Sequence, residues 1–272
     1  MNIGLALSGG GAKGAFQQGV LEVFKSSGIL SHIQVISGVS IGALHAMAVA
    51  SDKLEFSKDV WLTVDKKEAF DDGKTLLERL KLHEYDVLNQ GLFPVDTLNQ
   101  LLDQFLDDVP LLKDVYVGTT KMSKKNPTFT SIFKYNLQYL RRGHLPIDFI
   151  HINTLPFDLI KKILLASTAI PVVFRPVQIG DTMHVDGGIY NNMPIKPLVD
   201  ENVDKIIVID LFKYNLRRKP EAEGIPIYHI YPSKSLGRVL DFNPESAALN
   251  IAYGKEVALE HLSELKHFLE LS

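Results

Sequence analysis

Residues 2–26, NIGLALSGGGAKGAFQQGVLEVFKS, carry the pattern that decides the fold. The apolar run 2–7 is bounded by glycine, which is typical of a buried parallel strand. Four glycines follow within six residues, and 15–26 then has apolar residues at helical spacing. A strand that passes through a glycine turn into a helix predicts an α/β fold in which backbone N–H groups approach something negatively charged.

The rest of the chain continues this alternation of strands and helices. The leucine-rich stretch 52–112 has helical spacing and is interpreted as a helical, lid-like excursion from the sheet. We therefore expect one domain over residues 1–272, a three-layer α/β/α fold with a mostly parallel central sheet. Further strands are predicted at 33–38, 115–120, 128–133, 172–180, 182–188, 205–212 and 225–232, and helices at 40–51, at 157–170 and after a cap at Asn243.

Composition excludes several classes of function. The chain has no cysteine, which excludes disulfides, zinc–thiolate sites, iron–sulfur clusters and cysteine nucleophiles. The net charge is −3 and the short basic runs lie beside turn formers, so we expect no nucleic-acid partner. No apolar run approaches the ~18 residues of a transmembrane helix, and the N-terminus lacks a signal-like basic region. We therefore expect a cytoplasmic protein, and leave peripheral contact with a membrane open.

The first glycine motif resembles a nucleotide-binding loop only in part. Residues 9–14 satisfy G-x-G-x-x-G between a predicted strand and a predicted helix, which is the context of the dinucleotide fingerprint. That fingerprint also requires an acidic residue at the end of the second strand, yet this strand ends in Ser37-Gly38. A Walker A loop is not matched either, because no lysine follows the final glycine. Nucleotide binding and a purely structural turn remain as alternatives.

A second motif, GVSIG at 38–42, lies where the second predicted strand passes into a helix. In a G-x-S-x-G turn the serine takes a strained backbone, its Oγ is exposed at the end of the sheet, and the flanking Gly38 and Gly42 leave room. The N–H of Ile41 lies at the helix N-terminus, where the dipole favours an anion. Ser40 is therefore a candidate nucleophile, and an inert turn of small residues is the alternative.

The two motifs are expected to face each other. Loops after the first two strands of a parallel sheet open at the same edge, so the N–H groups of Gly9, Gly10 and Gly11 are candidates to stabilise an oxyanion formed at Ser40. Side chains on this loop would hold a substrate carbonyl away from those N–H groups, which gives a reason for glycine.

No histidine lies in an obviously catalytic sequence context. His229, after a late strand, is the best candidate for a serine–acid–histidine triad, while His45, His261 and His267 are expected on helices. A structural or surface role is the better interpretation of each. An acidic residue stands out instead: Asp186 ends a predicted strand directly before two glycines, where α/β sheets carry their chemistry. An ordinary Asp-Gly turn is the alternative.

Three motifs in this order and context resemble the patatin-like phospholipases: GGGAKG at 9–14, GVSIG at 38–42 and DGG at 186–188. The resemblance extends to ASTAIPVVFRPV at 166–177 and to NNMP at 191–194. It implies a Ser–Asp dyad without histidine, in which Ser40 is the nucleophile and Asp186 the general base. It also implies that Gly9, Gly10 and Gly11 supply the oxyanion hole. The Ile41 N–H is a further candidate donor because of its place at the helix N-terminus. The residues that support the motifs are Lys13, which holds the family's basic position, Gly14, Gly38, Gly42, Gly187 and Gly188.

The resemblance further implies a serine lipid acyl hydrolase acting on acyl esters of phospholipids or related lipids. An acyltransferase or thioesterase that uses the same serine remains the alternative, because water and an acceptor compete for one acyl-enzyme. We expect no cofactor and no metal site. The stretch 52–112 is a candidate to line an acyl channel or to rest on a membrane as an amphipathic lid, although simple packing on the sheet explains it as well.

Overall fold

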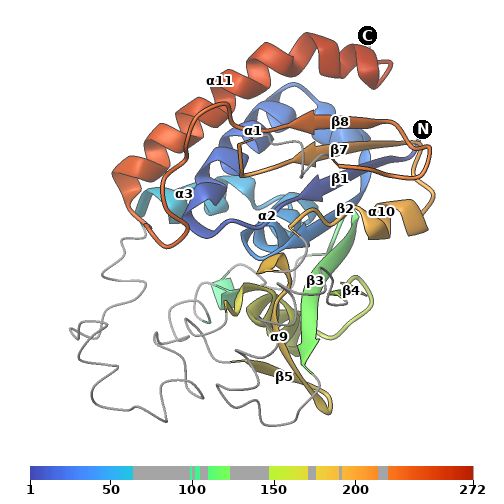
Figure 1. The fold of residues 1–272 in the computed structure, drawn as a ribbon, viewed down its shortest axis with the longest axis vertical. Helices are drawn as coiled ribbons and strands as arrows, with labels where there is room; N and C mark the ends of the chain where they lie inside the picture. The colour runs from blue at the N-terminus through green and yellow to red at the C-terminus, as the bar shows by residue number, and fades with distance from the viewer. Residues whose placement is uncertain are drawn as a thin grey trace, which may run out of the picture.

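The computed structural model is an α/β fold whose central sheet is mostly parallel and has helices on both faces (Figure 1). This confirms the predicted fold class. Pairing joins the strands in the sequence β5-β6-β3-β2-β1-β7-β8, and β4 also pairs with β3. The strands from β3 to β8 along this order run parallel, while β4, β5 and β6 are antiparallel to their neighbours. The structure describes residues 1–63, 99, 102–104, 110–122, 147–170, 176–189, 192–213 and 220–271.

The elements are labelled as in Figure 1. The strands are β1 (Ile3–Leu7), β2 (Ile33–Val39), β3 (Asp114–Met122), β4 (Ile147–His151), β5 (Val177–Ile179), β6 (Thr182–Asp186), β7 (Lys205–Ile209) and β8 (Ile227–Ile230). The α-helices are α1 (Gly14–Ser26), α2 (Ile41–Ala50), α3 (Leu54–Thr63), α9 (Phe157–Thr168), α10 (Lys196–Asp200) and α11 (Pro244–Phe268). Short 3₁₀ turns follow β1 at Gly11–Lys13 and β6 at Gly187–Ile189.

Most of the predicted elements are confirmed where the structure describes them. Of the predicted excursion at 52–112, α3 is a described helix, and most of the remainder lies outside the described residues. The predicted strand at 128–133 also lies outside them. Strand β4 and the short helix α10 were not predicted, because each is only five residues long and lacks a strong apolar pattern. The single-domain organisation stays a prediction.

The core lies mainly on the face of the sheet that α1, α2 and α11 cover (Figure 1). Phe16 and Phe24 of α1 are fully buried there, as are Leu5 and Leu7 of β1. Helix α11 begins as predicted, because the Asn243 side chain accepts a hydrogen bond from the Ser246 N–H at 2.9 Å. A smaller apolar cluster around Leu198 of α10 covers the other face.

Three strands pair with β3, and their arrangement positions the end of β2. Strand β2 pairs with residues 114–118 of β3, β4 with 116–120, and β6 with 119–122. Because β4 overlaps both of the others along β3, it must occupy the opposite edge. Strands β2 and β6 therefore share one edge of β3, one after the other, and run toward each other.

The register brings the carboxyl ends of these two strands together. Gly118 of β3 pairs with Val39, the last residue of β2. The next residue, Thr119, pairs with Asp186, the last residue of β6. Ser40 and Asp186 are thereby placed at the same point of the sheet, although 146 positions separate them in sequence.

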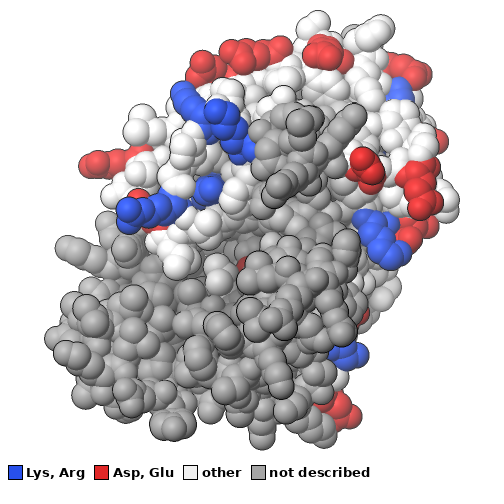
Figure 2. All heavy atoms as spheres, viewed as in Figure 1, with Lys and Arg blue, Asp and Glu red and all other residues white. Residues whose placement is uncertain are grey.

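On the face seen in Figure 2, the described residues include charged side chains of both signs. In Figure 2 acidic side chains gather at the end of the molecule where α11 lies, and basic side chains are interspersed below them. This agrees with a net charge of only −3. None of the described helices is both long enough and apolar enough to cross a bilayer.

Candidate active site

Ser40 occupies a strained turn between β2 and α2. Its backbone angles are φ 54° and ψ −129°, and its side chain is almost buried at 6% exposure. A positive φ in a residue other than glycine costs of order 1–3 kcal/mol and persists only where the surroundings impose it. Gly42 shows how close those surroundings are, because a Cβ there would lie 2.2 Å from the Leu7 carbonyl oxygen. Helix α2 therefore begins directly against the end of β1.

Asp186 is buried beside Ser40. It is 3% exposed, and its Oδ1 accepts the Gly188 N–H at 2.6 Å. Burial raises the pKa of this carboxyl to about 7, while hydrogen bonds from the Ser40 side chain and the Gly188 backbone oppose the rise. A carboxyl with this pKa is partly ionised at neutral pH, and the strand register places it beside Ser40, so it is able to act as a base.

The first glycine of the loop lies against Ser40. A Cβ on Gly9 would lie 3.0 Å from the Ser40 Cβ and 2.8 Å from Asn192 Oδ1. A Cβ on Gly188 would lie 3.1 Å from Asp186 Oδ1 and 3.1 Å from the same Asn192 oxygen. The three sequence motifs therefore meet around one point. Asn192, from the NNMP segment, was not predicted to lie there and completes the contact between two glycine turns.

The other loop glycines have different neighbours. A Cβ on Gly10 would lie 2.9 Å from Leu211, and one on Gly11, whose φ is +55°, would lie 2.2 Å from the Val239 carbonyl oxygen. That oxygen accepts the Ala12 N–H at 2.8 Å, which ties the loop to residues before α11. Within the described part of the chain, the N–H groups of Gly9 and Gly10 donate no hydrogen bond. They remain available to an acceptor.

The residues predicted to support the motifs pack the turns together. Ile41, the first residue of α2, contacts Gly14, where a Cβ would lie 2.5 Å from Ile41 Cγ1. Lys13 Nζ lies 4.1 Å from the centre of the Phe212 ring, in the geometry of a cation–π contact. Two pairs of glycines are also closely packed: a Cβ on Gly38 would lie 2.4 Å from the Gly42 carbonyl oxygen, and one on Gly187 would lie 2.8 Å from the Gly118 carbonyl oxygen.

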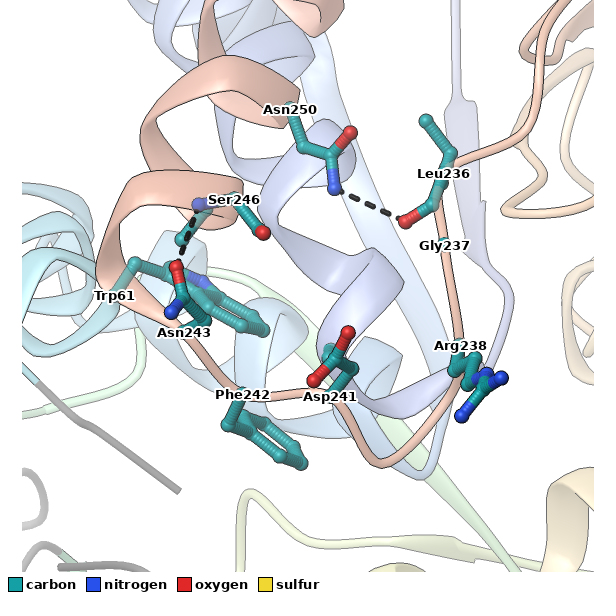
Figure 3. Close-up of a pocket in the computed structure, with 11 residues that line it drawn as sticks. Trp61, Leu236, Gly237, Arg238, Asp241, Phe242, Asn243, Ser246 and Asn250 are labelled. Carbon is teal, nitrogen blue, oxygen red and sulfur yellow. Dashed lines mark hydrogen bonds between the residues drawn. The ribbon is translucent and has the colours of Figure 1, made fainter. Parts of the chain in front are cut away.

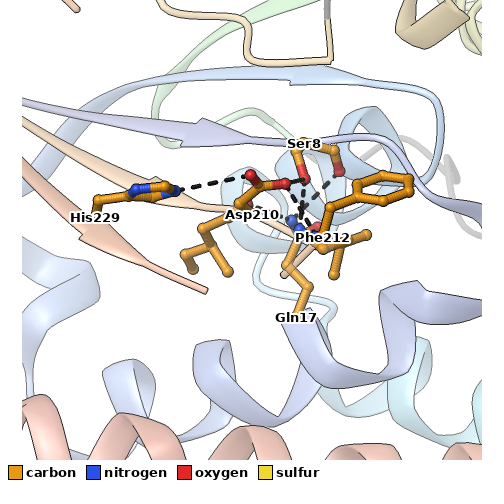
Figure 4. Close-up of polar contacts among 7 residues, drawn as sticks. Ser8, Gln17, Asp210, Phe212 and His229 are labelled. Atoms are coloured by element: carbon orange, nitrogen blue, oxygen red, sulfur yellow. Dashed lines mark hydrogen bonds and ion pairs between the residues drawn. The ribbon is translucent and has the colours of Figure 1, made fainter. Parts of the chain in front are cut away.

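A buried polar cluster anchors the start of the glycine loop (Figure 4). Ser8 accepts the Leu211 N–H at 2.9 Å and donates to Asp210 Oδ1 at 3.3 Å. Gln17 donates to the carbonyl oxygens of Ser8 and of the last residue of β7, at 3.4 and 3.2 Å. The His229 ring faces Asp210, with Nε2 3.8 Å from Oδ2. Ser8 is fully buried, so this serine–acid–histidine cluster supports the loop and is not accessible to a substrate.

The other candidate histidines also have partners away from Ser40. His45 is buried, accepts the Trp61 indole N–H at 3.1 Å and therefore donates from Nδ1 to Gln17 at 2.8 Å. Burial lowers the pKa of His45 to about 3, so the ring stays neutral. His261 Nδ1 lies 2.8 Å from the Tyr228 hydroxyl. In the described ranges, no hydrogen bond joins a histidine to Ser40 or Asp186.

Two hollows are lined by described residues, and neither lining includes Ser40 or Asp186. One of about 40 Å³ lies beside the glycine loop, between Trp61, Arg238 and the start of α11 (Figure 3). Its volume suits a water molecule or two and not an acyl chain. A larger hollow of about 830 Å³ lies beside β8 and is lined by His229, Tyr231 and residues 220–227. Neither of these two hollows is therefore the binding site of an acyl chain at Ser40.

Comparison with known proteins places these features in a family. The family sequence model for patatin-like phospholipase matches residues 5–199. The lysophospholipase nte1 of Aspergillus oryzae is 25% identical over 222 residues, which cover 77% of this chain but only 12% of that protein. The probable lipid hydrolase 463L of Invertebrate iridescent virus 6 is 23% identical over 194 residues, covering 70% of this chain and 61% of that protein. This chain thus spans less than two thirds of either relative.

A solved structure shares the fold. The crystal structure of VipD from Legionella pneumophila aligns with 97% of this chain and 67% of its own, at a TM-score of 0.51 and 17% identity. This likeness supports the architecture and says nothing of activity. The match over residues 5–199 covers well over half of the sequence, and the chain therefore belongs to the patatin-like phospholipase family.

Proposed function

We propose that the protein is a serine lipid acyl hydrolase that cleaves acyl esters of phospholipids or related lipids through a Ser40–Asp186 dyad. Membership of the patatin-like phospholipases supports lipid hydrolase activity in general. The observation that carries the finer proposal is the end-to-end approach of β2 and β6, which sets a strained serine beside a buried carboxyl.

In the proposed mechanism, Asp186 removes the Ser40 proton as Oγ attacks the ester carbonyl carbon. The carbonyl electrons move to oxygen, and the free N–H groups at Gly9 and Gly10 stabilise the resulting oxyanion. The intermediate collapses, and the leaving alcohol or lysolipid takes the proton from Asp186. Water then attacks the acyl-enzyme and gives a proton to Asp186, and the fatty acid leaves as Ser40 is reprotonated.

The raised pKa answers the main difficulty of such a dyad. An ordinary aspartate, with a pKa of 3.8, holds its proton too weakly to be an effective base near neutral pH. Burial brings the pKa to about 7, so Asp186 is both ionised and basic in this range. Esters suit this arrangement better than amides, because an alcohol leaves with less help from a general acid.

Fatty-acid release from lipid esters is expected to rise with pH through a midpoint near 7 and to level off above it. The reason is that only the ionised Asp186 accepts a proton, and its pKa is raised to about 7. The measurement is free fatty acid released by the purified protein from a panel of diacyl- and lysophospholipids and neutral lipid esters, from pH 5 to pH 9.

Each rate should be accompanied by circular dichroism at the same pH, so that unfolding is not mistaken for titration. Parallel reactions with added glycerol or lysolipid separate hydrolysis from acyl transfer. Release of fatty acid with the expected midpoint supports the proposal. Acylated acceptor as the main product, no product from any ester, or a rate that is already maximal at pH 5 would contradict it.

Gly9→Ala is expected to lower kcat by about 10²- to 10³-fold, the usual effect of losing one oxyanion donor. The added methyl group would be forced against the Ser40 Cβ and Asn192, so the loop must move away from the site. Ester hydrolysis and thermal unfolding should both be measured. Gly28→Ala is the matched control. Its added Cβ would meet nothing within 4 Å, so any loss of stability would come from the φ of +79° and not from a contact with the site. Equal kcat in Gly9→Ala and wild type would exclude Gly9 from the oxyanion hole.

A further inference from the structure

The end of α9 contacts both members of the proposed dyad. The Ser40 N–H donates to Ser167 Oγ at 2.9 Å. Two residues further on, the carbonyl oxygen of Ala169 accepts the Asp186 N–H at 3.0 Å. Ser167 is fully buried and Ala169 nearly so, which means that water cannot readily replace either contact. A single short segment therefore holds the nucleophile and the base by their backbones.

The Ser167 hydroxyl also reaches β3. It donates to the Gly118 carbonyl oxygen at 2.8 Å, so one hydroxyl connects a backbone donor at Ser40 with a backbone acceptor at Gly118. Gly118 is the residue of β3 at which pairing passes from β2 to β6. Ser167 thus lies where β2 ends and separates from β3. Its hydroxyl connects the Ser40 N–H to the Gly118 carbonyl oxygen at this point.

Both backbone groups need such a partner. A buried N–H or C=O without a hydrogen bond costs about 1–3 kcal/mol, and the positive φ of Ser40 adds strain that the surroundings must hold. Without the Ser167 hydroxyl, Ser40 would lower the energy by turning its N–H toward another acceptor or toward ordinary backbone angles. Either movement shifts its Oγ relative to Asp186.

We propose that Ser167 is a positioning residue that fixes Ser40 against Asp186 without touching the substrate. The inference rests on the Ser40–Asp186 dyad proposed above. It assigns a role to the serine one residue before the end of α9, and the role is specific to the hydroxyl, since one oxygen must both accept and donate.

Ser167→Ala is expected to lower kcat for ester hydrolysis by about 10- to 100-fold with KM changed less than about twofold, since a displacement near 1 Å has effects of this size. The pH midpoint should also rise, because the hydrogen bond from Ser40 lowers the pKa of Asp186 and would be weakened. Ser167→Cys keeps the size of the side chain with a weaker donor and acceptor, so its kcat should lie between wild type and Ser167→Ala.

Ser51→Ala is the matched control. Ser51 is also buried, and its hydroxyl donates to the Met47 carbonyl oxygen at 2.7 Å. It follows the last residue of α2, at the end of this helix away from Ser40. It should lose stability like Ser167→Ala and keep the wild-type kcat and pH midpoint. If Ser167→Ala does not fold, Ser167→Cys gives the same comparison.

Wild-type kcat and pH midpoint in the folded Ser167 variants would overturn the positioning role. That result is distinct from failure of the proposed function, which would appear as activity retained in Ser40→Ala or Asp186→Asn. A shifted midpoint with lowered kcat in the Ser167 variants, and neither change in Ser51→Ala, supports the inference.

Discussion

Replacing Ser40 with alanine is expected to lower kcat for ester hydrolysis by about 10⁴- to 10⁶-fold, the loss typical of removing a catalytic serine. The reason is that no acyl-enzyme forms without Oγ, whereas the fold should change little. The alanine must take the same positive φ, so the variant gains no relief from strain. The measurement is steady-state release of fatty acid from the best ester of the panel.

The comparison needs a serine whose loss is structural. Ser51→Ala, at the far end of α2, should retain full activity, and thermal unfolding of both variants should confirm that they are folded. A Ser40→Ala protein that is folded and retains more than a small percentage of wild-type activity would show that another group is the nucleophile.

Asp186→Asn is expected to lose about 10⁴-fold in kcat and, at alkaline pH, to unfold at a higher temperature than wild type. The pKa of Asp186 in the folded protein is about 7, well above its ordinary value of 3.8. The folded state therefore holds this proton more tightly than the unfolded state does. Asp186 therefore stabilises the fold less as pH rises from about 4 to 7. Over this range the free energy of unfolding falls by about 1.4 kcal/mol per pH unit.

Asparagine does not titrate and keeps an oxygen for the Gly188 N–H. The stability advantage of Asp186→Asn over wild type should therefore grow from pH 4 to pH 7 and then stay constant. Urea unfolding of both proteins at pH 4, 5.5, 7 and 8.5 measures it. An advantage that is the same at every pH, or that shrinks as pH rises, would mean that Asp186 is not a buried carboxyl of raised pKa.

The fold was predictable because its strongest signals are local. At the N-terminus an apolar run passes through a glycine turn into a helix, and the same pattern recurs around GVSIG. These two strand–turn–helix units predict two neighbouring parallel strands, β1 and β2. The direction of β6 was not predictable in this way. Whether a strand runs parallel or antiparallel depends on the partner it finds, and the pairing of Thr119 with Asp186 joins residues far apart in sequence.

The candidate site was predictable in its motifs and not in its supports. Ser40, Asp186 and Gly9 stand at strand ends beside glycines, which is a recognisable sequence context. Ser167 and Asn192 lie in the segments 166–177 and 191–194 that share the family resemblance, but the sequence assigned no role to them or to the Ser8–Asp210 contact, because each acts through tertiary hydrogen bonds or packing contacts. The oxyanion hole and the dyad themselves stay predictions.

The most direct test of the Ser–Asp dyad is the rate at which a fluorophosphonate modifies the protein, with the modified residue identified by mass spectrometry. The account predicts that Ser40 is labelled in wild type, that labelling accelerates with pH around 7, and that it slows strongly in Asp186→Asn. It further predicts that Ser40 is still labelled in His229→Ala and that this labelling still accelerates around pH 7, because the His229 ring faces Asp210 and not the dyad. Labelling at another residue, or labelling of Ser40 that depends on His229 and not on Asp186, would contradict the dyad.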